Sequence, residues 1–172
     1  TAITTVFRCH RVPLVNKIIF SGTFDPFTNG HLDVALRAAK LCSELVILVL
    51  ENKEKDTLFT IDEREKMIRD VIADQKKIRV DSWSGLLVDY CEENDIKTII
   101  RGLRNELDYN YESVMALTNT RLLPGCETIF VITSPEFSYI SSSAVRTIAA
   151  YGGNVDKMVP PTIAAEIKRK FA

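Results

Sequence analysis

Residues 17–41 constrain the fold of this chain more than any other segment. They begin with a short apolar run, Lys17–Phe20, pass through a polar turn, Ser21–His31, and end in an amphipathic stretch, Leu32–Leu41. This order predicts a strand, a turn and a helix, which together form the first half of a βαβ unit. Gly22 lets the backbone turn tightly where it leaves the predicted strand.

The polar turn carries groups that suit the binding of an anion. It brings His31 close to the first turn of the predicted helix, where unpaired backbone N–H groups and the positive end of the helix dipole favour negative charge. Thr23 adds a hydroxyl to the same turn. These residues predict a phosphate site, and the alternative is a plain connection that bears a surface histidine.

Strands and helices alternate through the rest of the chain. Strands are predicted at residues 45–50, 77–81, 97–100 and 128–132, and helices at 61–73, 86–94, 108–123 and 161–171, with one more helix opening at Ser141. The alternation predicts a single doubly wound, Rossmann-like α/β domain with a five-stranded, mainly parallel sheet. This domain is expected to span residues 17–172, and residues 1–16 are expected to form a partly disordered N-terminal extension.

The polar candidates all follow predicted strands. Thr23 follows the first strand, Lys55 the second, Arg101 and Arg104 the fourth, and the serines 141–143 the fifth. Ligands of doubly wound sheets bind outside the carboxyl ends of the strands, where the strand order reverses. The sequence therefore predicts that these groups share one binding site.

Composition excludes several other kinds of protein. A formal net charge of -1 with 26% charged residues does not fit a general binder of nucleic acid. No apolar run reaches the roughly 20 residues of a membrane helix. The four cysteines are scattered without a Cys-x-x-Cys pair, which favours reduced thiols in the cytoplasm, and two histidines do not suggest a metal centre. Neither the P-loop nor the G-x-G-x-x-G motif occurs.

Three motifs resemble one family. Thr28-x-Gly30-His31 resembles the T/H-x-G-H signature of the nucleotidylyltransferase superfamily, and residues 22–31 are most similar to the bacterial phosphopantetheine adenylyltransferase family. Residues 100–104 resemble the family's I-R-G-L-R block, and residues 140–146 its I-S-S-S/T-x-x-R signature. The resemblance runs from about Lys17 to Ala172. It implies a nucleotidyltransferase of coenzyme A biosynthesis that transfers the adenylyl group of ATP to 4′-phosphopantetheine, giving dephospho-coenzyme A and pyrophosphate.

The same resemblance assigns roles to individual residues. It implies that His31 stabilises the transition state and that Lys55 and Arg104 assist catalysis. The ATP contacts that it implies are Thr23, Phe24, His31, Gly102, Leu103, Arg104, Glu112, Phe137, Ser138, Tyr139, Ile140, Ser141, Ser142 and Ser143. Contacts to the acceptor are implied for Thr23, Lys55, Leu87 and Arg101, with Lys53 as the substitute for Lys55 if the loop register differs by two. No metal-ligating side chain is implied.

Several of these residues have a plainer interpretation. Lys55 lies in a loop crowded with opposite charges, which is typical of a solvated loop, and an isolated R-x-x-R is typical of a protein surface. Glu112 fits an exposed helix acid, and Leu87 an ordinary core residue. The serines that open a helix serve first as caps, which is compatible with phosphate binding. The chain departs from the family at two positions. Ser21 stands where the family often has proline, and Phe137 stands where it often has tryptophan.

The implied reaction needs neither a general base nor a covalent nucleophile. A phosphate monoester has a second pKa of about 6, so the nucleophile is already ionised at neutral pH. Mg²⁺ bound mainly by the triphosphate fits, because no carboxylate cage is visible. The resemblance further implies a homohexamer and feedback inhibition by coenzyme A. The alternatives are a relative that uses nicotinamide mononucleotide or glycerol 3-phosphate as acceptor, and a nucleotide sensor without catalysis.

Overall fold

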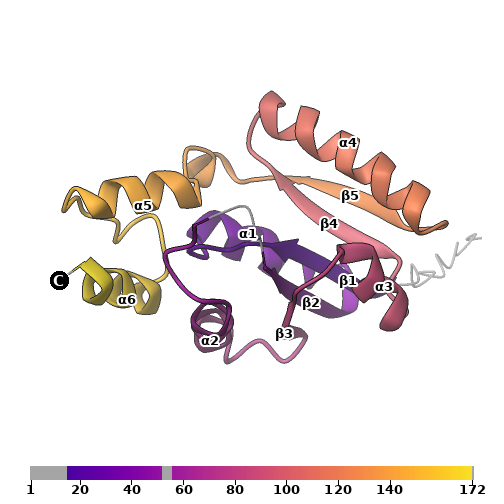
Figure 1. Cartoon of the computed structure of the whole chain (residues 1–172), viewed down its shortest axis with the longest axis horizontal. Helices are drawn as coiled ribbons and strands as arrows, with labels where there is room; N and C mark the ends of the chain where they lie inside the picture. Colours follow the sequence, from indigo (N-terminus) through magenta and orange to yellow (C-terminus); the bar gives the residue numbers. More distant parts are fainter. Residues whose placement is uncertain (1–14, 52–55, 172) are drawn as a thin grey trace, which may run out of the picture.

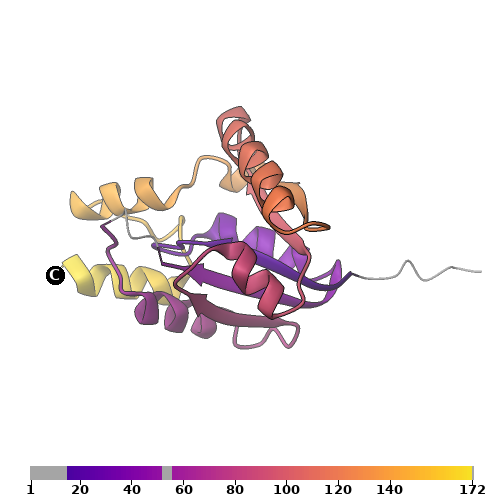
Figure 2. The same cartoon turned by 45° about the vertical axis from the view of Figure 1, so that its right-hand side comes forward.

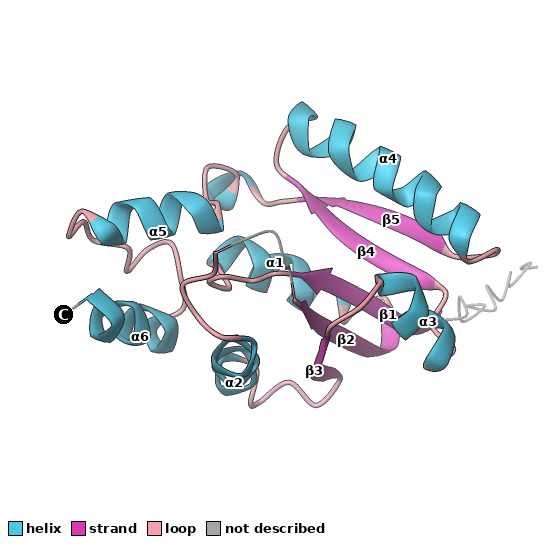
Figure 3. Cartoon of the chain, viewed as in Figure 1, coloured by secondary structure: helices cyan, strands magenta, loops and turns pink. Residues whose placement is uncertain are grey.

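A five-stranded, fully parallel sheet forms the centre of the molecule (Figures 1 and 3). The computed structural model describes residues 15–51 and 56–171. The strands are β1 (Val15–Gly22), β2 (Cys42–Leu50), β3 (Ile78–Trp83), β4 (Thr98–Leu103) and β5 (Glu127–Ile132). Their order is β3-β2-β1-β4-β5, and each neighbouring pair is parallel. The predicted doubly wound α/β fold is confirmed, and the sheet is fully rather than mainly parallel.

Helices connect the strands and continue beyond the last one. They are α1 (Asn29–Ala38), α2 (Ile61–Val71), α3 (Leu87–Glu93), α4 (Glu106–Leu122), α5 (Ser142–Ala150) and α6 (Pro161–Phe171), with a short 3₁₀ helix, η1 (Pro135–Phe137). In both views α5 and α6 lie together at one end of the molecule (Figures 1 and 2). No helix in the described part of the chain combines the length and the apolar character needed to span a bilayer.

Both faces of the sheet are buried at β1 and β2. Along β1, Ile18 and Phe20 belong to one core cluster and Ile19 to the other, because successive side chains of a strand point to opposite faces. The first cluster includes residues of α1, α2, α5 and α6, and the second includes residues of α3 and Leu123, which follows α4. Burial on both faces explains the apolar runs at residues 18–20 of β1 and 45–50 of β2.

α1 begins earlier than the sequence predicted, and β4 ends later. α1 begins at Asn29 rather than near Leu32, because Thr28 is its N-cap. β4 continues through Leu103, so Arg101 and Gly102 lie within the strand and pair with Phe130 and Val131 of β5. The order in which strands are added to the sheet reverses between β1 and β4. The carboxyl ends of these two strands form the switch point where ligands of such sheets bind.

Candidate active site

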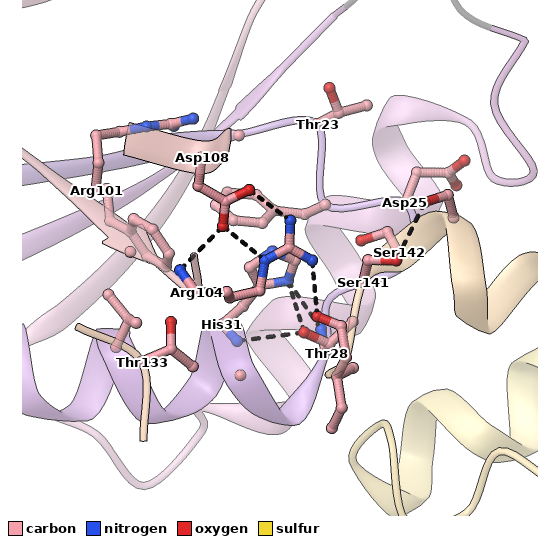
Figure 4. A pocket seen from close by; sticks show the side chains of 18 of the residues that line it. Thr23, Asp25, Thr28, His31, Arg101, Arg104, Asp108, Thr133, Ser141 and Ser142 are labelled. Atoms are coloured by element: carbon pink, nitrogen blue, oxygen red, sulfur yellow. Dashed lines mark hydrogen bonds and ion pairs between the residues drawn. The ribbon is translucent and has the colours of Figure 1, made fainter. Parts of the chain in front are cut away.

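A cleft of about 610 Å³ opens at the switch point. Its lining comes from the β1–α1 turn, the end of β4, the first turns of α4, and the N-terminus of α5. Figure 4 shows Arg104 and Asp108 meeting in the cleft, with His31, Thr28, Ser141 and Ser142 nearby. The cleft thus combines residues mainly from three regions that are far apart in the sequence: 20–34, 101–112 and 140–146.

The N-terminus of α1 is closed by a capping box that includes His31. The Thr28 hydroxyl accepts from His31 N at 3.3 Å, and Thr28 N donates to His31 Nδ1 at 3.0 Å. Because a backbone N–H only donates, Nδ1 is the acceptor, and the ring proton is on Nε2. The cap therefore fixes both the orientation and the tautomer of the imidazole.

His31 stays neutral near physiological pH. Its pKa is lowered from 6.5 to about 3, mainly because the ring is removed from water and secondly because Arg101 and Arg104 place positive charge nearby. The imidazole stands beside the rings of Phe24 and Phe27, with centroids 5.1 and 5.5 Å away. A neutral imidazole whose Nε2–H is free to donate suits a phosphoryl oxygen and does not suit general-acid chemistry.

Arg101, within β4, and Arg104, just after it, are each held by a carboxylate of α4. Arg104 Nε and Nη2 donate to the two oxygens of Asp108, both at 2.8 Å, and Arg104 Nη1 donates to the Ile140 carbonyl at 3.0 Å. Arg101 Nε donates to Glu112 at 2.8 Å. Asp108 raises the pKa of Arg104, and Arg104 lowers the pKa of Asp108. Both guanidinium groups are therefore oriented and charged before any ligand binds.

The serines of the I-S-S-S block open α5 at the edge of the cleft. Ser141 is the N-cap and accepts from Ala144 N at 3.0 Å, while Ser142 Oγ donates to the Pro26 carbonyl at 2.8 Å. Ser143 lies within 3.2 Å of the Ser141 hydroxyl. The first N–H groups of α5 border the cleft, which is the arrangement that binds phosphates at helix N-termini.

Opposite charges nearly balance within the described lining of the cleft. Its charged residues are Arg101, Arg104, Arg146, Asp25, Asp56, Asp108 and Glu112. Each arginine has a carboxylate partner, since Arg146 also pairs with Asp25 at 3.4 Å. A polyphosphate entering this cleft would therefore need a further cation to offset its charge.

The structure brings most of the predicted site residues together. The cleft is lined by Thr23, Phe24, His31, Arg101, Gly102, Arg104, Glu112, Ile140, Ser141, Ser142 and Ser143. Its lining does not include Leu103, Phe137, Ser138 or Tyr139, although Phe137 Cβ lies 3.5 Å from the position of a Cβ added to Gly30. Lys53 and Lys55 lie outside the described residues, as do residues 1–14 of the predicted extension; Val15 and Asn16 belong to β1.

Leu87 stands apart from the other predicted residues. It begins α3, is partly buried, and packs against the core cluster that contains Val88 and Cys91. It is not part of the cleft lining. Its predicted contact with the acceptor stays a prediction, and its observed packing is that of a core residue.

Sequence reasoning missed three charged residues that shape the site: Asp25, Arg64 and Asp108. The spacing of Arg104 and Asp108, four residues apart at the start of a helix, is a signal that could have revealed their ion pair. Asp25 accepts from the backbone N–H groups of Leu58 and Phe59, and that contact spans more than 30 residues. No local sequence pattern predicts such a contact.

The comparisons with known proteins agree with this geometry. The sequence model of the family described as cytidylyltransferase-like matches residues 19–148. A phosphopantetheine adenylyltransferase of Dictyoglomus turgidum is 44% identical over 155 residues, which cover 90% of this chain and 97% of the relative. One of Clostridium botulinum is 45% identical over 153 residues, which cover 89% and 93%. The chain belongs to the phosphopantetheine adenylyltransferase family, within the cytidylyltransferase-like nucleotidyltransferases.

Proposed function

We propose that this chain transfers the adenylyl group of ATP to 4′-phosphopantetheine, giving dephospho-coenzyme A and pyrophosphate in coenzyme A biosynthesis. The observation that carries the proposal is the identity of about 44% to curated phosphopantetheine adenylyltransferases over 90% of the chain. The cleft supports it, because the matched motifs converge there around a neutral histidine, two oriented arginines and a helix N-terminus.

The reaction joins two phosphate groups, so the cleft must hold both anions and leave the bond exchange unobstructed. A phosphate oxygen of the acceptor attacks the α-phosphorus of ATP, a new P–O bond forms, and the bond to pyrophosphate breaks. The acceptor phosphate has a second pKa of about 6, so it needs no base to ionise it at neutral pH. Orientation and charge stabilisation carry the rate, as in other phosphoryl transfers.

Each assigned residue has a part in that scheme. His31 donates from Nε2 to an oxygen of the reacting phosphate, and Arg104 and Lys55 offset the charge that develops there. Thr23, Lys55, Leu87 and Arg101 contact the acceptor. ATP is held by Thr23, Phe24, Gly102, Leu103, Arg104, Glu112, Phe137, Ser138, Tyr139, Ile140, Ser141, Ser142 and Ser143.

Mg²⁺ enters this scheme with the triphosphate. Within residues 15–51 and 56–171, no group of three or more His, Cys, Asp or Glu side chains could hold a metal ion. The arginines of the described lining are already paired with carboxylates, so a cation carried by ATP suits the charge balance of the cleft. The ion would supply charge stabilisation at the phosphates, with oxygens of ATP and water as its main ligands.

The proposal includes a homohexamer that works in the cytoplasm and is inhibited by coenzyme A. The exposed apolar side chains of α4 support self-association, since a monomer rarely exposes so many on one helix. They are Leu107, Tyr109, Tyr111, Val114, Met115, Leu117 and Leu122. The buried free thiols of Cys42, Cys91 and Cys126 fit a reducing compartment.

Pyrophosphate release tests the proposal. The enzyme is given MgATP with 4′-phosphopantetheine, nicotinamide mononucleotide or glycerol 3-phosphate in separate reactions, and the nucleotide product is identified by mass. Turnover with phosphopantetheine alone, yielding dephospho-coenzyme A, is expected. Turnover with another acceptor would show that the proposed acceptor is wrong but that the chain transfers a nucleotidyl group. ATP binding without turnover on any acceptor would indicate a nucleotide sensor.

A further inference from the structure

Arg64 of α2 is a buried charge that the proposed chemistry does not use. Its exposed fraction is 2%, and it is not part of the cleft lining. Nη1 donates to the carbonyl oxygens of Thr23 and Leu50, at 2.6 and 3.2 Å, and Nε donates to those of Phe59 and Thr60, at 3.1 and 3.3 Å. One guanidinium therefore ties the ends of β1 and β2 to the start of α2.

Burial of a charged guanidinium group at this position is unfavourable in free energy. Its hydrogen bonds are to neutral carbonyl oxygens, and burial lowers its pKa even though Asp25 and Glu51 partly offset that effect. An apolar side chain of similar size often stabilises a fold as much as a buried charge does. Arg64 is therefore better explained by the conformation that it imposes than by stability alone.

The conformation in question is that of the β1–α1 turn. Thr23, whose carbonyl Arg64 holds, lines the cleft, and the next residue, Phe24, has a φ of 50°, in the left-handed region that bulky residues rarely adopt. Such a conformation persists only where the surroundings enforce it. Asp25 adds to that support by accepting from Leu58 N at 2.8 Å and Phe59 N at 3.0 Å.

We propose that Arg64 is a positioning residue, which holds the Thr23–Phe24 peptide so that the Thr23 side chain meets the nucleotide. The role rests on the proposed function only through the contact between Thr23 and ATP. Arg64 acts through the turn and does not touch the substrate. Its removal should therefore weaken ATP binding only while Thr23 is present.

The test is a double-mutant cycle on the dissociation constant of MgATP, measured by calorimetry without acceptor. Arg64→Lys keeps the charge but loses the planar fork, and it is expected to weaken ATP binding about fivefold to tenfold, the effect of one lost hydrogen bond. In a Thr23→Ala background the same substitution should change the constant less than about twofold, because the group that it positions is absent. Arg69→Lys, on an exposed part of the same helix, serves as the matched control. It should leave the dissociation constant of MgATP unchanged in both backgrounds.

The possible results separate this role from its alternatives. An equal loss in both backgrounds, or a lower melting temperature with unchanged ATP affinity of the folded protein, would mean that Arg64 is merely structural. If Arg64→Lys does not fold, Arg64→Gln replaces it in the cycle, and failure of both to fold would overturn the proposal. A wild-type protein that does not bind ATP would instead contradict the proposed function.

Discussion

Among single residues, His31 best shows how the fold selects one chemical form. The donor at Thr28 N leaves Nδ1 as acceptor, and burial with two nearby arginines keeps the ring neutral. A free histidine would be partly protonated near neutral pH and would exist as two tautomers. In the cleft the imidazole is a fixed, uncharged hydrogen-bond donor, because its neighbours select one protonation state and one tautomer.

The lowered pKa of His31 predicts a particular pH dependence. Its folded pKa of about 3 is below the unfolded value of 6.5, so the unfolded state binds more protons between these values. His31 is therefore expected to reduce the stability of the fold as pH falls from 6.5 towards 3, and to have no such effect above 6.5. Chemical denaturation of wild type and His31→Asn at pH 7.5 and 5 should show the stronger acid loss in wild type.

Nuclear magnetic resonance gives a second reading of the same group. The ring signal of His31, assigned by its absence in His31→Asn, should not titrate between pH 5 and 8, and its ¹⁵N shifts should report a proton on Nε2. A midpoint near 6.5 would contradict the neutral donor. The reaction itself should then lose rate below pH 6 because the acceptor phosphate becomes protonated, not because His31 does.

Among the elements, α1 and α2 begin in the same way but border different surroundings. Both open with a threonine capping box: Thr28 with His31 in α1, and Thr60 with Glu63 in α2. Only the α1 box is part of the cleft lining. The two helices therefore allow the structural and chemical effects of a cap to be measured separately.

Removal of each cap is expected to have different consequences. Thr28→Ala and Thr60→Ala should each lower stability by about 1 kcal/mol, since each deletes an N-cap hydroxyl. Only Thr28→Ala should also reduce kcat, because the imidazole loses the hydroxyl that helps to orient it. The measurement is kcat at a temperature where both variants are fully folded. An equal fall in kcat for both variants would show that the effect comes through stability.

The elements also show what sequence patterns could and could not predict. Apolar runs were sufficient for all five strands, and the family motifs identified most of the cleft lining. The start of α1 was predicted late because the residue at the third helical position is His31, whereas a capping box usually has Glu or Gln there. β4 was predicted short because Arg101 is not typical of a buried strand; its side chain donates to Glu112 of α4. Asp25 and Arg64 act through long-range contacts to backbone groups, which leave no local pattern.

For the whole molecule, α4 is the element through which we propose that copies of the chain meet. Considering the described residues alone, no residue of α4 is buried, and Leu107 and Leu117 are 78% and 73% exposed. The same helix supplies Asp108 and Glu112, which orient the arginines of the cleft. Assembly through α4 would therefore fix the helix that orients both cations.

Disruption of this face should dissociate the assembly. Leu117→Glu places a charge among the exposed apolar side chains of α4 and is expected to convert the proposed hexamer to smaller species in light scattering. Tyr151→Glu is the control, because Tyr151 is 90% exposed but lies after α5, away from α4. A wild-type monomer, or a hexamer that Leu117→Glu leaves intact, would contradict assembly through α4.

In the proposed mechanism, two phosphate groups react in this cleft with His31 as a neutral donor to the transition state. Its most direct test compares kcat with 4′-phosphopantetheine, and the dissociation constant of MgATP, between wild type and His31→Asn. We expect kcat to fall about a hundredfold or more while the dissociation constant changes less than about threefold, as for the loss of a donor that acts in the transition state. A variant that keeps wild-type kcat, or that loses ATP binding as much as it loses turnover, would contradict it.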